Sequence, residues 1–333
     1  MKRLSDINEI LSFIKDRTKK RTWITFHSIG DRDCVGASIA MKSIFENAQI
    51  STPDFITNNS KSMLRRINLL KEIKTSMPKD PELIIILDAN RFELLGSFED
   101  RIKNNKNCEV LFIDHHEFPS IPEYKNNNYV FNDEKYNSAS SIVYEIVKGF
   151  GIQLENETAM ALLNGIIADS ANFQNADSTT FMQISELLKL CKMDYQKVVG
   201  IHQNTPMATR KNVMEDLFNA KIDQAGEFII VEGLALYHAN LAAEAALNVG
   251  ADAAIFWSVK NNEVSLSARL RSPLDKEQNL HLGKIMDSVG AMLDGTGGGH
   301  PCAAGAYGKK KSAINNAKEY AIKKIREALM QEY

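Results

Sequence analysis

The chain has few cysteines, no long apolar run and almost no net charge, and each of these absences narrows its class. Its four cysteines are scattered without CxxC spacing, which fits neither a disulfide framework nor a thiolate zinc site. We therefore expect a reducing, cytoplasmic location. No stretch of about 18 consecutive apolar residues occurs, so we expect no membrane span. With 40 basic and 42 acidic residues, no global field favours nucleic acid or a membrane surface.

Alternating apolar segments predict an α/β fold for the first part of the chain. Short β-branched runs at 22–26, 83–88 and 109–114 are separated by segments with helical spacing at 36–47 and 60–75. This alternation predicts a mostly parallel sheet flanked by helices. Further helical patterns at 138–148, 155–169 and 179–190 complete a predicted domain over residues 1–190. The segment 1–7 carries charges where a secretory signal would continue its apolar core, so we interpret it as an amphipathic helix without export.

A second, smaller α/β domain is predicted over residues 213–333. The segment 191–212 is polar and contains Pro206, which interrupts the periodicity and predicts a linker or hinge. After it, strands are expected at 227–236, 253–260 and 263–270, and helices at 241–249, 282–293 and 312–330. We expect the active site to lie in the cleft between the two domains.

Metal-binding side chains follow three of the predicted strands. The candidates are His27, Asp31, Asp33, Asp88, Asp114, His115 and His116. Because the carboxyl ends of parallel strands meet at one edge of a sheet, these side chains should gather there. Carboxylates and imidazoles without thiolates favour manganese, with magnesium or cobalt as substitutes and zinc as a further alternative. The set exceeds the needs of one ion and favours two, which suits phosphate ester hydrolysis. The competing interpretation is helix capping and solvated histidines.

Two features of the second domain are candidate phosphate contacts. On the predicted strand 263–270, period-two spacing puts Arg269 and Arg271 on one face, where guanidinium groups could bind phosphate. The glycine run 295–299, which precedes His300, would let backbone amides approach an anion as a loop. A solvated strand face and a flexible loop without function are the alternatives.

Five ordered motifs resemble those of the DHH phosphoesterase superfamily with its DHH-associated C-terminal domain. They lie at 27–37, 88–90, 114–116, 165–170 and 297–305. The chain departs from the family pattern at Gly30, where proline is common, at Ala37, where serine is frequent, and at 88–90, which lacks the usual hydroxyl and second acid. These departures are neighbours of the predicted ligands and bear on substrate preference.

The resemblance implies roles for individual residues. One manganese would be held by His27, Asp31 and Asp88, and the other by Asp33, Asp88, His115 and Asp169, with Asp88 bridging the two ions. Asp114 would orient the histidines and His116 would face the scissile phosphate. The implied substrate contacts are Arg269, Arg271, Gly297, Gly298, Gly299 and His300.

The expected function is manganese-dependent hydrolysis of phosphodiester or phosphomonoester bonds. The motifs resemble the oligoribonuclease and phosphoadenosine-phosphate phosphatase branch, which implies a short oligonucleotide or small nucleotide as substrate. The near-neutral charge disfavours processive degradation of long DNA, the activity of the larger RecJ-type relatives. Exopolyphosphatase or pyrophosphatase activity, cleavage of linear dinucleotides, and a noncatalytic nucleotide-binding regulator stay open as alternatives. Oligomeric state is open too, and a homodimer is compatible with the sequence.

Overall fold

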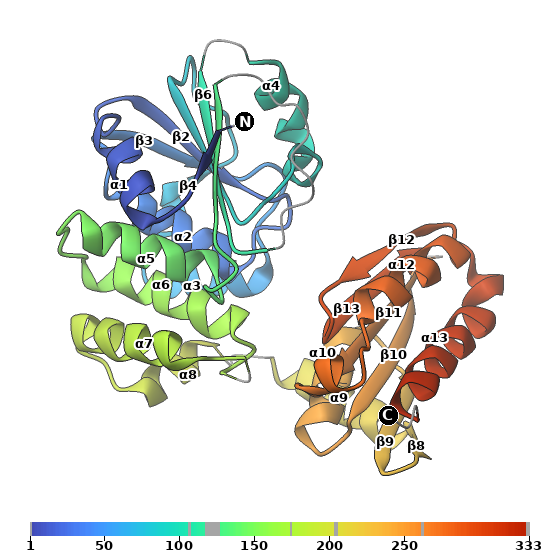
Figure 1. The fold of residues 1–333 in the computed structure, drawn as a ribbon. Coiled ribbons are helices and arrows are strands. Elements are labelled where there is room, and N and C mark those ends of the chain that lie inside the picture. The colour runs from blue at the N-terminus through green and yellow to red at the C-terminus, as the bar shows by residue number, and fades with distance from the viewer. Residues whose placement is uncertain are drawn as a thin grey trace. The chain divides into compact units, whose positions relative to one another are not determined.

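The computed structural model describes residues 2–105, 108–116, 127–173, 175–202, 206–260 and 263–330. The chain divides into two compact units, residues 1–204 and 205–333 (Figure 1). This boundary falls inside the segment 191–212 that the sequence predicts as a linker, and residues 203–205 lie outside the described part. Much of the segment is helical, because α8 (Tyr195–His202) and α9 (Met207–Phe218) occupy it.

The first unit is built on a seven-stranded sheet in the order β1-β7-β6-β5-β2-β3-β4, and every pairing in it is parallel. This confirms the predicted parallel α/β fold. The strands are β1 (Lys2–Leu4), β2 (Arg21–Phe26), β3 (Asn47–Ser51), β4 (Ile73–Lys74), β5 (Leu83–Leu87), β6 (Glu109–Asp114) and β7 (Asn128–Asn132).

Helices cover both faces of this sheet, which explains why the central strands are continuous apolar runs. Along β5, Ile85 packs into one core with α2, α5 and α6, whereas Ile84 and Ile86 pack on the opposite face against Phe92 and its neighbours. The helices are α1 (Ile7–Lys15), α2 (Arg32–Lys42), α3 (Asn58–Arg66), η1 (Leu70–Glu72), η2 (Phe92–Phe98), α4 (Glu99–Asn104), α5 (Ala139–Gly149), α6 (Asn156–Asp169) and α7 (Ser178–Cys191).

The second unit contains a six-stranded mixed sheet in the order β12-β13-β11-β10-β9-β8. Among the residues described in this unit, β9 and β10 pair in parallel and the other pairings are antiparallel. Its strands are β8 (Lys221–Ala225), β9 (Phe228–Leu234), β10 (Ala253–Lys260), β11 (Glu263–Leu270), β12 (Gly295–Gly299) and β13 (Ala303–Gly308). Its helices after α9 are α10 (Ala239–Asn248), α11 (Leu274–Glu277), α12 (Leu282–Met292), η3 (Lys311–Ala313) and α13 (Ile314–Leu329).

Several local predictions are wrong at segment ends. The helix predicted over 1–7 is instead strand β1, which pairs with β7, and helix α1 begins only at Ile7 after the cap Asp6. The helix predicted over 60–75 ends at Arg66, because Asn68 adopts a left-handed φ of 56°. The helix predicted over 36–47 ends at Lys42, and β3 follows it.

The glycine run 295–299 is also not a loop. It forms the edge strand β12, and glycine is required there by close packing against α12. A Cβ atom on Gly297 would lie 1.7 Å from the carbonyl oxygen of Met286, and one on Gly290 would lie 2.3 Å from the carbonyl carbon of Thr296. The absent side chains therefore let the helix lie directly on the strand backbone.

Among the described residues, no helix is long and apolar enough to cross a membrane.

Candidate metal centre

The centre lies where the strand order of the parallel sheet reverses. From β2 the chain adds β3 on one side, whereas from β5 it adds β6 and β7 on the other. His27 follows the last residue of β2, Asp88 follows the last residue of β5, and Asp114 is the last residue of β6. The sheet topology therefore gathers these three side chains at one edge, at the position where open α/β sheets commonly bind ligands.

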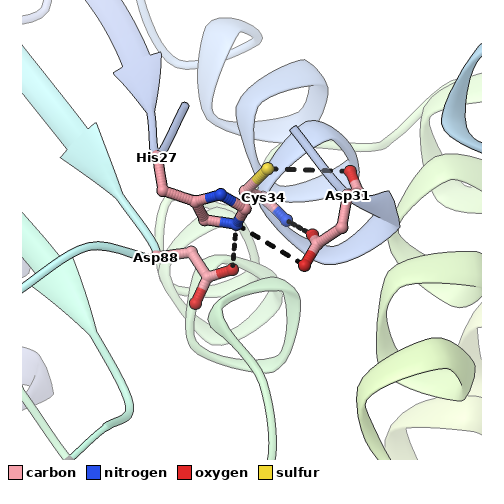
Figure 2. Close-up of side chains that lie close together, drawn as sticks. All are labelled: His27, Asp31, Cys34 and Asp88. Carbon is pink, nitrogen blue, oxygen red and sulfur yellow. Dashed lines mark hydrogen bonds and ion pairs between the residues drawn. The ribbon is translucent and has the colours of Figure 1, made fainter. Parts of the chain in front are cut away.

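The start of helix α2 orients Asp31. One of its carboxylate oxygens, Oδ1, accepts the backbone N–H groups of Asp33 and Cys34 at 3.0 and 3.1 Å, as an N-cap does. Its other oxygen, Oδ2, lies 3.5 Å from His27 Nε2 (Figure 2). The preceding turn needs Gly30, whose φ of 55° is closed to the proline that is common in the family. In this chain the glycine therefore permits the turn that leads into Asp31.

Asp88 lies between two imidazoles that come from different strands. Its Oδ2 is 3.3 Å from His27 Nε2, and its Oδ1 is 3.5 Å from His115 Nε2. The residue is buried and has a left-handed φ of 56°, while its N–H donates to the carbonyl oxygen of Ile113 at 3.0 Å. A non-glycine residue with this φ is uncommon and often marks a functional position.

Asp33 and Asp169 approach His115 from the helical layer. Asp169 is the last residue of α6, and its Oδ2 lies 3.1 Å from His115 Nε2. The buried carboxylate of Asp33 accepts the N–H groups of Ala139 and Ser140 at 2.6 and 2.8 Å, in the first turn of α5. The helix N-terminus stabilises this buried negative charge and fixes its direction.

Asp114 orients the two histidines that follow it. Its Oδ1 accepts the backbone N–H groups of His115 and His116 at 2.7 and 3.1 Å, and it lies 2.8 Å from His116 Nδ1. On the neighbouring strand, the Asn132 side-chain amide donates to the carbonyl oxygens of Asp114 and His116 at 3.1 and 2.6 Å. Residues 114–116 are therefore held in place through the Asp114 side chain and through the backbone carbonyls of Asp114 and His116.

The charges of the cluster are strongly coupled. Burial raises the pKa of Asp33 well above its usual value, and the nearby carboxylates of Asp88 and Asp169 raise it further. Burial also opposes ionisation of Asp88, yet His115 and His27 lower the pKa of Asp88 well below its usual range. For His115 burial opposes protonation, but Asp169 and Asp88 raise its pKa well above the usual value. The raised pKa values of Asp33 and His115 both reflect neighbouring carboxylates, and carboxylates crowded in this way favour a bound cation.

The donor set fits divalent metal ions. Potential ligand atoms within 4.8 Å of one another form three groups, which are His27 with Asp31, Cys34 and Asp88; Asp88 with Asp114, His115 and His116; and Asp33 with His115 and Asp169. Asp88 Oδ1, Asp114 Oδ2 and His115 Nε2 are buried and make no hydrogen bond within the described residues. Buried polar atoms that make ion-pair contacts or none, and no hydrogen bond, are costly, so their gathering at one place indicates a position for a cation. All six predicted metal ligands lie in this cluster.

The predicted substrate contacts belong to the second unit and differ among themselves. Arg269 is half-buried on β11, donates to Ser267 Oγ at 3.3 Å, and forms no ion pair within the described part of the chain. Burial lowers the pKa of this guanidinium. Arg271 instead lies one residue beyond β11, so the predicted shared strand face does not extend to it, and its Nε donates to Asp252 at 2.7 Å.

The glycine run and His300 form the second part of the predicted substrate contacts. Gly298 and Gly299 have φ values of 147° and 131°, which only glycine adopts readily, and His300 follows the end of β12. A Cβ atom on Gly298 would contact only Asp287, at 3.2 Å. The run thus combines tight packing at Gly297 with an accessible backbone at Gly298.

Sequence reasoning missed two residues of the cluster. Asn132 follows an asparagine-rich stretch that gave no strand signal, and its role depends on β7 pairing with β6. Cys34 lies inside the first motif, directly after Asp33, but it has no CxxC spacing to another cysteine, so the sequence pattern did not mark it as a possible metal ligand. Only the first turn of α2 brings its sulfur to the cluster (Figure 2).

Comparison with known proteins supports the same class of protein. The family model described as DHH family, N-terminal domain, matches residues 21–166, and the DHHA1 domain model matches residues 237–327. The chain is 30% identical to an uncharacterised protein of Methanocaldococcus jannaschii over 95% of this chain and 94% of that protein. It is 28% identical to NrnA of Streptococcus mutans, a probable bifunctional oligoribonuclease and PAP phosphatase, over 84% of this chain and 87% of that protein.

A solved structure shows the same fold. The exopolyphosphatase-related protein of Bacteroides fragilis superimposes with a TM-score of 0.79 over 98% of this chain and 97% of that chain, at 17% identity. A parallel sheet with carboxylates and imidazoles gathered at its switch point is an arrangement suited to metal-dependent hydrolysis. The chain belongs to the DHH family of phosphoesterases, as its two domain models show.

Proposed function

We propose that this protein hydrolyses phosphodiester or phosphomonoester bonds of short oligonucleotides or small nucleotides, with two divalent ions and manganese as the principal metal. The observation that carries the proposal is the placement of Asp88, whose two oxygens face His27 and His115 on opposite sides. One carboxylate in this position suits a bridge between two ions.

Two sets of side chains around Asp88 would hold the ions. His27 and Asp31 would complete one position, and Asp33, His115 and Asp169 the other. The bound pair would supply activation of water and neutralisation of the charge that develops on phosphorus. Carboxylates and imidazoles are ligands that manganese accepts readily, which supports it over zinc for the cluster as a whole.

Asp114 and His116 would act on the substrate side of the cluster. Because Asp114 Oδ1 accepts a hydrogen bond from His116 Nδ1, the ring is fixed with Nε2 as the nitrogen that can meet a phosphoryl oxygen or a leaving group. Burial opposes protonation of His116, but Asp114 raises its pKa above the usual value. A protonated ring would stabilise a phosphoryl oxygen and could donate a proton to the departing oxygen.

The second unit supplies the argument for a nucleotide substrate. Arg269 is a half-buried guanidinium that forms no ion pair with any residue the structure describes, which suits an anion such as a nucleotide phosphate. Gly298, Gly299 and His300 would add backbone and imidazole contacts, and Arg271 would contribute through its exposed face. The Streptococcus mutans relative, by its name an oligoribonuclease and PAP phosphatase, supports substrates of this size.

Turnover of a substrate panel tests the proposal. Full-length protein is incubated with Mn²⁺, Mg²⁺ or Co²⁺ and with ribodinucleotides, longer oligonucleotides, a nucleoside 3′,5′-bisphosphate, pyrophosphate and polyphosphate. We expect the fastest turnover with Mn²⁺ on dinucleotides or the bisphosphate. His116→Ala should lose most of this turnover, whereas His238→Ala, an exposed histidine of the second unit, should retain it.

The same panel separates the alternatives. Preference for polyphosphate or pyrophosphate would replace the nucleotide proposal with the exopolyphosphatase or pyrophosphatase alternative. Turnover confined to linear dinucleotides, with no hydrolysis of longer oligonucleotides or of the bisphosphate, would select the dinucleotide phosphodiesterase. Binding of nucleotides without turnover in any metal would indicate a noncatalytic regulator, which the complete set of clustered ligand side chains disfavours.

A further inference from the structure

Cys34 is a buried thiol at the metal centre that has no place in the predicted ligand set. It lies in the first turn of α2, three residues after the cap Asp31, and its side chain is fully buried. Asp33, one residue earlier, turns toward α5 and joins a different ligand group. Two successive residues of one helix thus face two different metal positions, since neighbours on a helix point about 100° apart.

The geometry puts the Cys34 sulfur among metal ligands. Its Sγ belongs to a group with His27, Asp31 and Asp88 in which every ligand atom lies within 4.8 Å of the others. Figure 2 shows the sulfur next to the His27 ring, on the side toward Asp31. Asp88 is also more than nine-tenths buried, and its Oδ2 faces this group, 3.3 Å from His27 Nε2 (Figure 2). A buried carboxylate is costly unless a positive charge compensates it, so its place on the same imidazole as the thiol indicates a cation position there.

A purely structural cysteine would look different, and the same unit contains one for comparison. Cys191 is buried at the end of α7, and its Sγ lies 3.6 Å from the carbonyl oxygen of Asn156. Cys34 makes an equivalent contact, 3.6 Å from the carbonyl oxygen of Asp31. Within the described residues, Cys191 belongs to no group of metal-binding side chains, whereas Cys34 does. Both thiols therefore make the same kind of hydrogen bond, but of the two only Cys34 lies among potential metal ligands.

We propose that Cys34 Sγ is a ligand of the ion held by His27, Asp31 and Asp88, so that this position is a mixed nitrogen, oxygen and sulfur site. The inference rests on the proposed two-metal centre. On binding, the Sγ–H proton leaves to solvent as the sulfur bonds to the metal. Thiolate ligands favour Zn²⁺, Co²⁺ or Fe²⁺ over Mn²⁺ and Mg²⁺. The second position, built from Asp33, His115 and Asp169, keeps only oxygen and nitrogen ligands and stays suited to Mn²⁺.

Cobalt spectroscopy tests this assignment without relying on catalysis. The full-length protein is stripped of metal with a chelator and titrated with Co²⁺, while equilibrium dialysis gives the number of ions bound. Cobalt bonded to a thiolate shows a sulfur-to-metal charge-transfer absorption in the near ultraviolet, and cobalt bonded only to oxygen and nitrogen does not. The variants are Cys34→Ser and the matched control Cys191→Ser.

We expect the charge-transfer absorption in wild type and in Cys191→Ser, and its loss in Cys34→Ser while cobalt remains bound. Cys34→Ser should also lower Zn²⁺ affinity by about 10–100-fold or more, because loss of a residue that only supports a metal ligand already has an effect of this size. The Mn²⁺ affinity of the second position should be unchanged. Wild-type protein that binds two cobalt ions without this absorption would overturn the role of Cys34 and leave the proposed function standing. Protein that binds no cobalt would overturn the metal centre and this inference together.

Discussion

Replacement of Asp88 by asparagine is the sharpest test of the two-metal centre. Asparagine has the same shape and is one of the few residues that tolerates the left-handed φ of 56° found at this position. Alanine would add backbone strain of about 1–2 kcal/mol and confuse the result. Asp88→Asn therefore removes one negative charge and little else.

The expected fall in kcat/KM follows from the position of the Asp88 carboxylate. Its two oxygens lie 3.3 Å from His27 Nε2 and 3.5 Å from His115 Nε2, so both proposed ions lose an anionic ligand at once. Metal ions contribute several kcal/mol to stabilisation of a phosphoryl transition state. A loss of about 4 kcal/mol corresponds to a fall in kcat/KM of about 10³-fold.

The assay needs a control with the same chemical change. Asp80 is exposed in the same unit and also has a left-handed φ, of 46°, so Asp80→Asn tests the substitution away from the cluster. Manganese binding is measured by calorimetry, hydrolysis with a ribodinucleotide, and folding by circular dichroism. We expect Asp80→Asn to behave as wild type. Near-normal turnover and metal stoichiometry in a folded Asp88→Asn protein would refute the bridging role.

Further predictions concern the substrate contact, helix packing and one ion pair. Arg269→Ala should raise KM for nucleotides about tenfold or more with kcat less affected, and unchanged kinetics would exclude its phosphate role. Gly36→Ala should lower the free energy of unfolding, measured in urea, by about 1–3 kcal/mol, because the new Cβ would lie 2.4 Å from the carbonyl oxygen of Ala161. A variant as stable as wild type would show that helices α2 and α6 can move apart to accept the methyl group without cost. Arg17 lowers the pKa of Glu109, and both side chains are 18% exposed, so Glu109→Gln should cost about 1 kcal/mol at neutral pH. Because the folded pKa is depressed, this difference should be complete above about pH 6 and vanish as pH falls through the folded pKa; a pH-independent difference would contradict the ion pair.

The sequence predicted the parts of the fold that depend on local pattern. Apolar runs such as 83–87 are buried on both faces of a parallel sheet, and the polar residue after each run lies at the carboxyl end of a strand. The sequence was less informative where pairing partners lie far away. Strand β1 covers residues read as helical, because its pairing with β7 overrides local preference.

The predicted ligands therefore follow from the sequence, while their arrangement follows from tertiary structure. An apolar run directly precedes His27 and Asp88, and another ends two residues before His115; these are local signals in the sequence. That Asp88 lies between the two imidazoles depends on β2, β5 and β6 being adjacent, which no local pattern states. The anchoring of Asp33 to the first turn of α5 joins segments more than a hundred residues apart.

The sequence by itself determined the class of this protein, its parallel sheet and the side chains that form the metal cluster. Only the tertiary structure decided that Cys34 joins that cluster and that the run 295–299 is a strand pressed against α12. The physical reason is the same in both cases. A side chain's chemistry is written in its own residue, but its neighbours are set by long-range packing and strand pairing, which a local pattern does not contain.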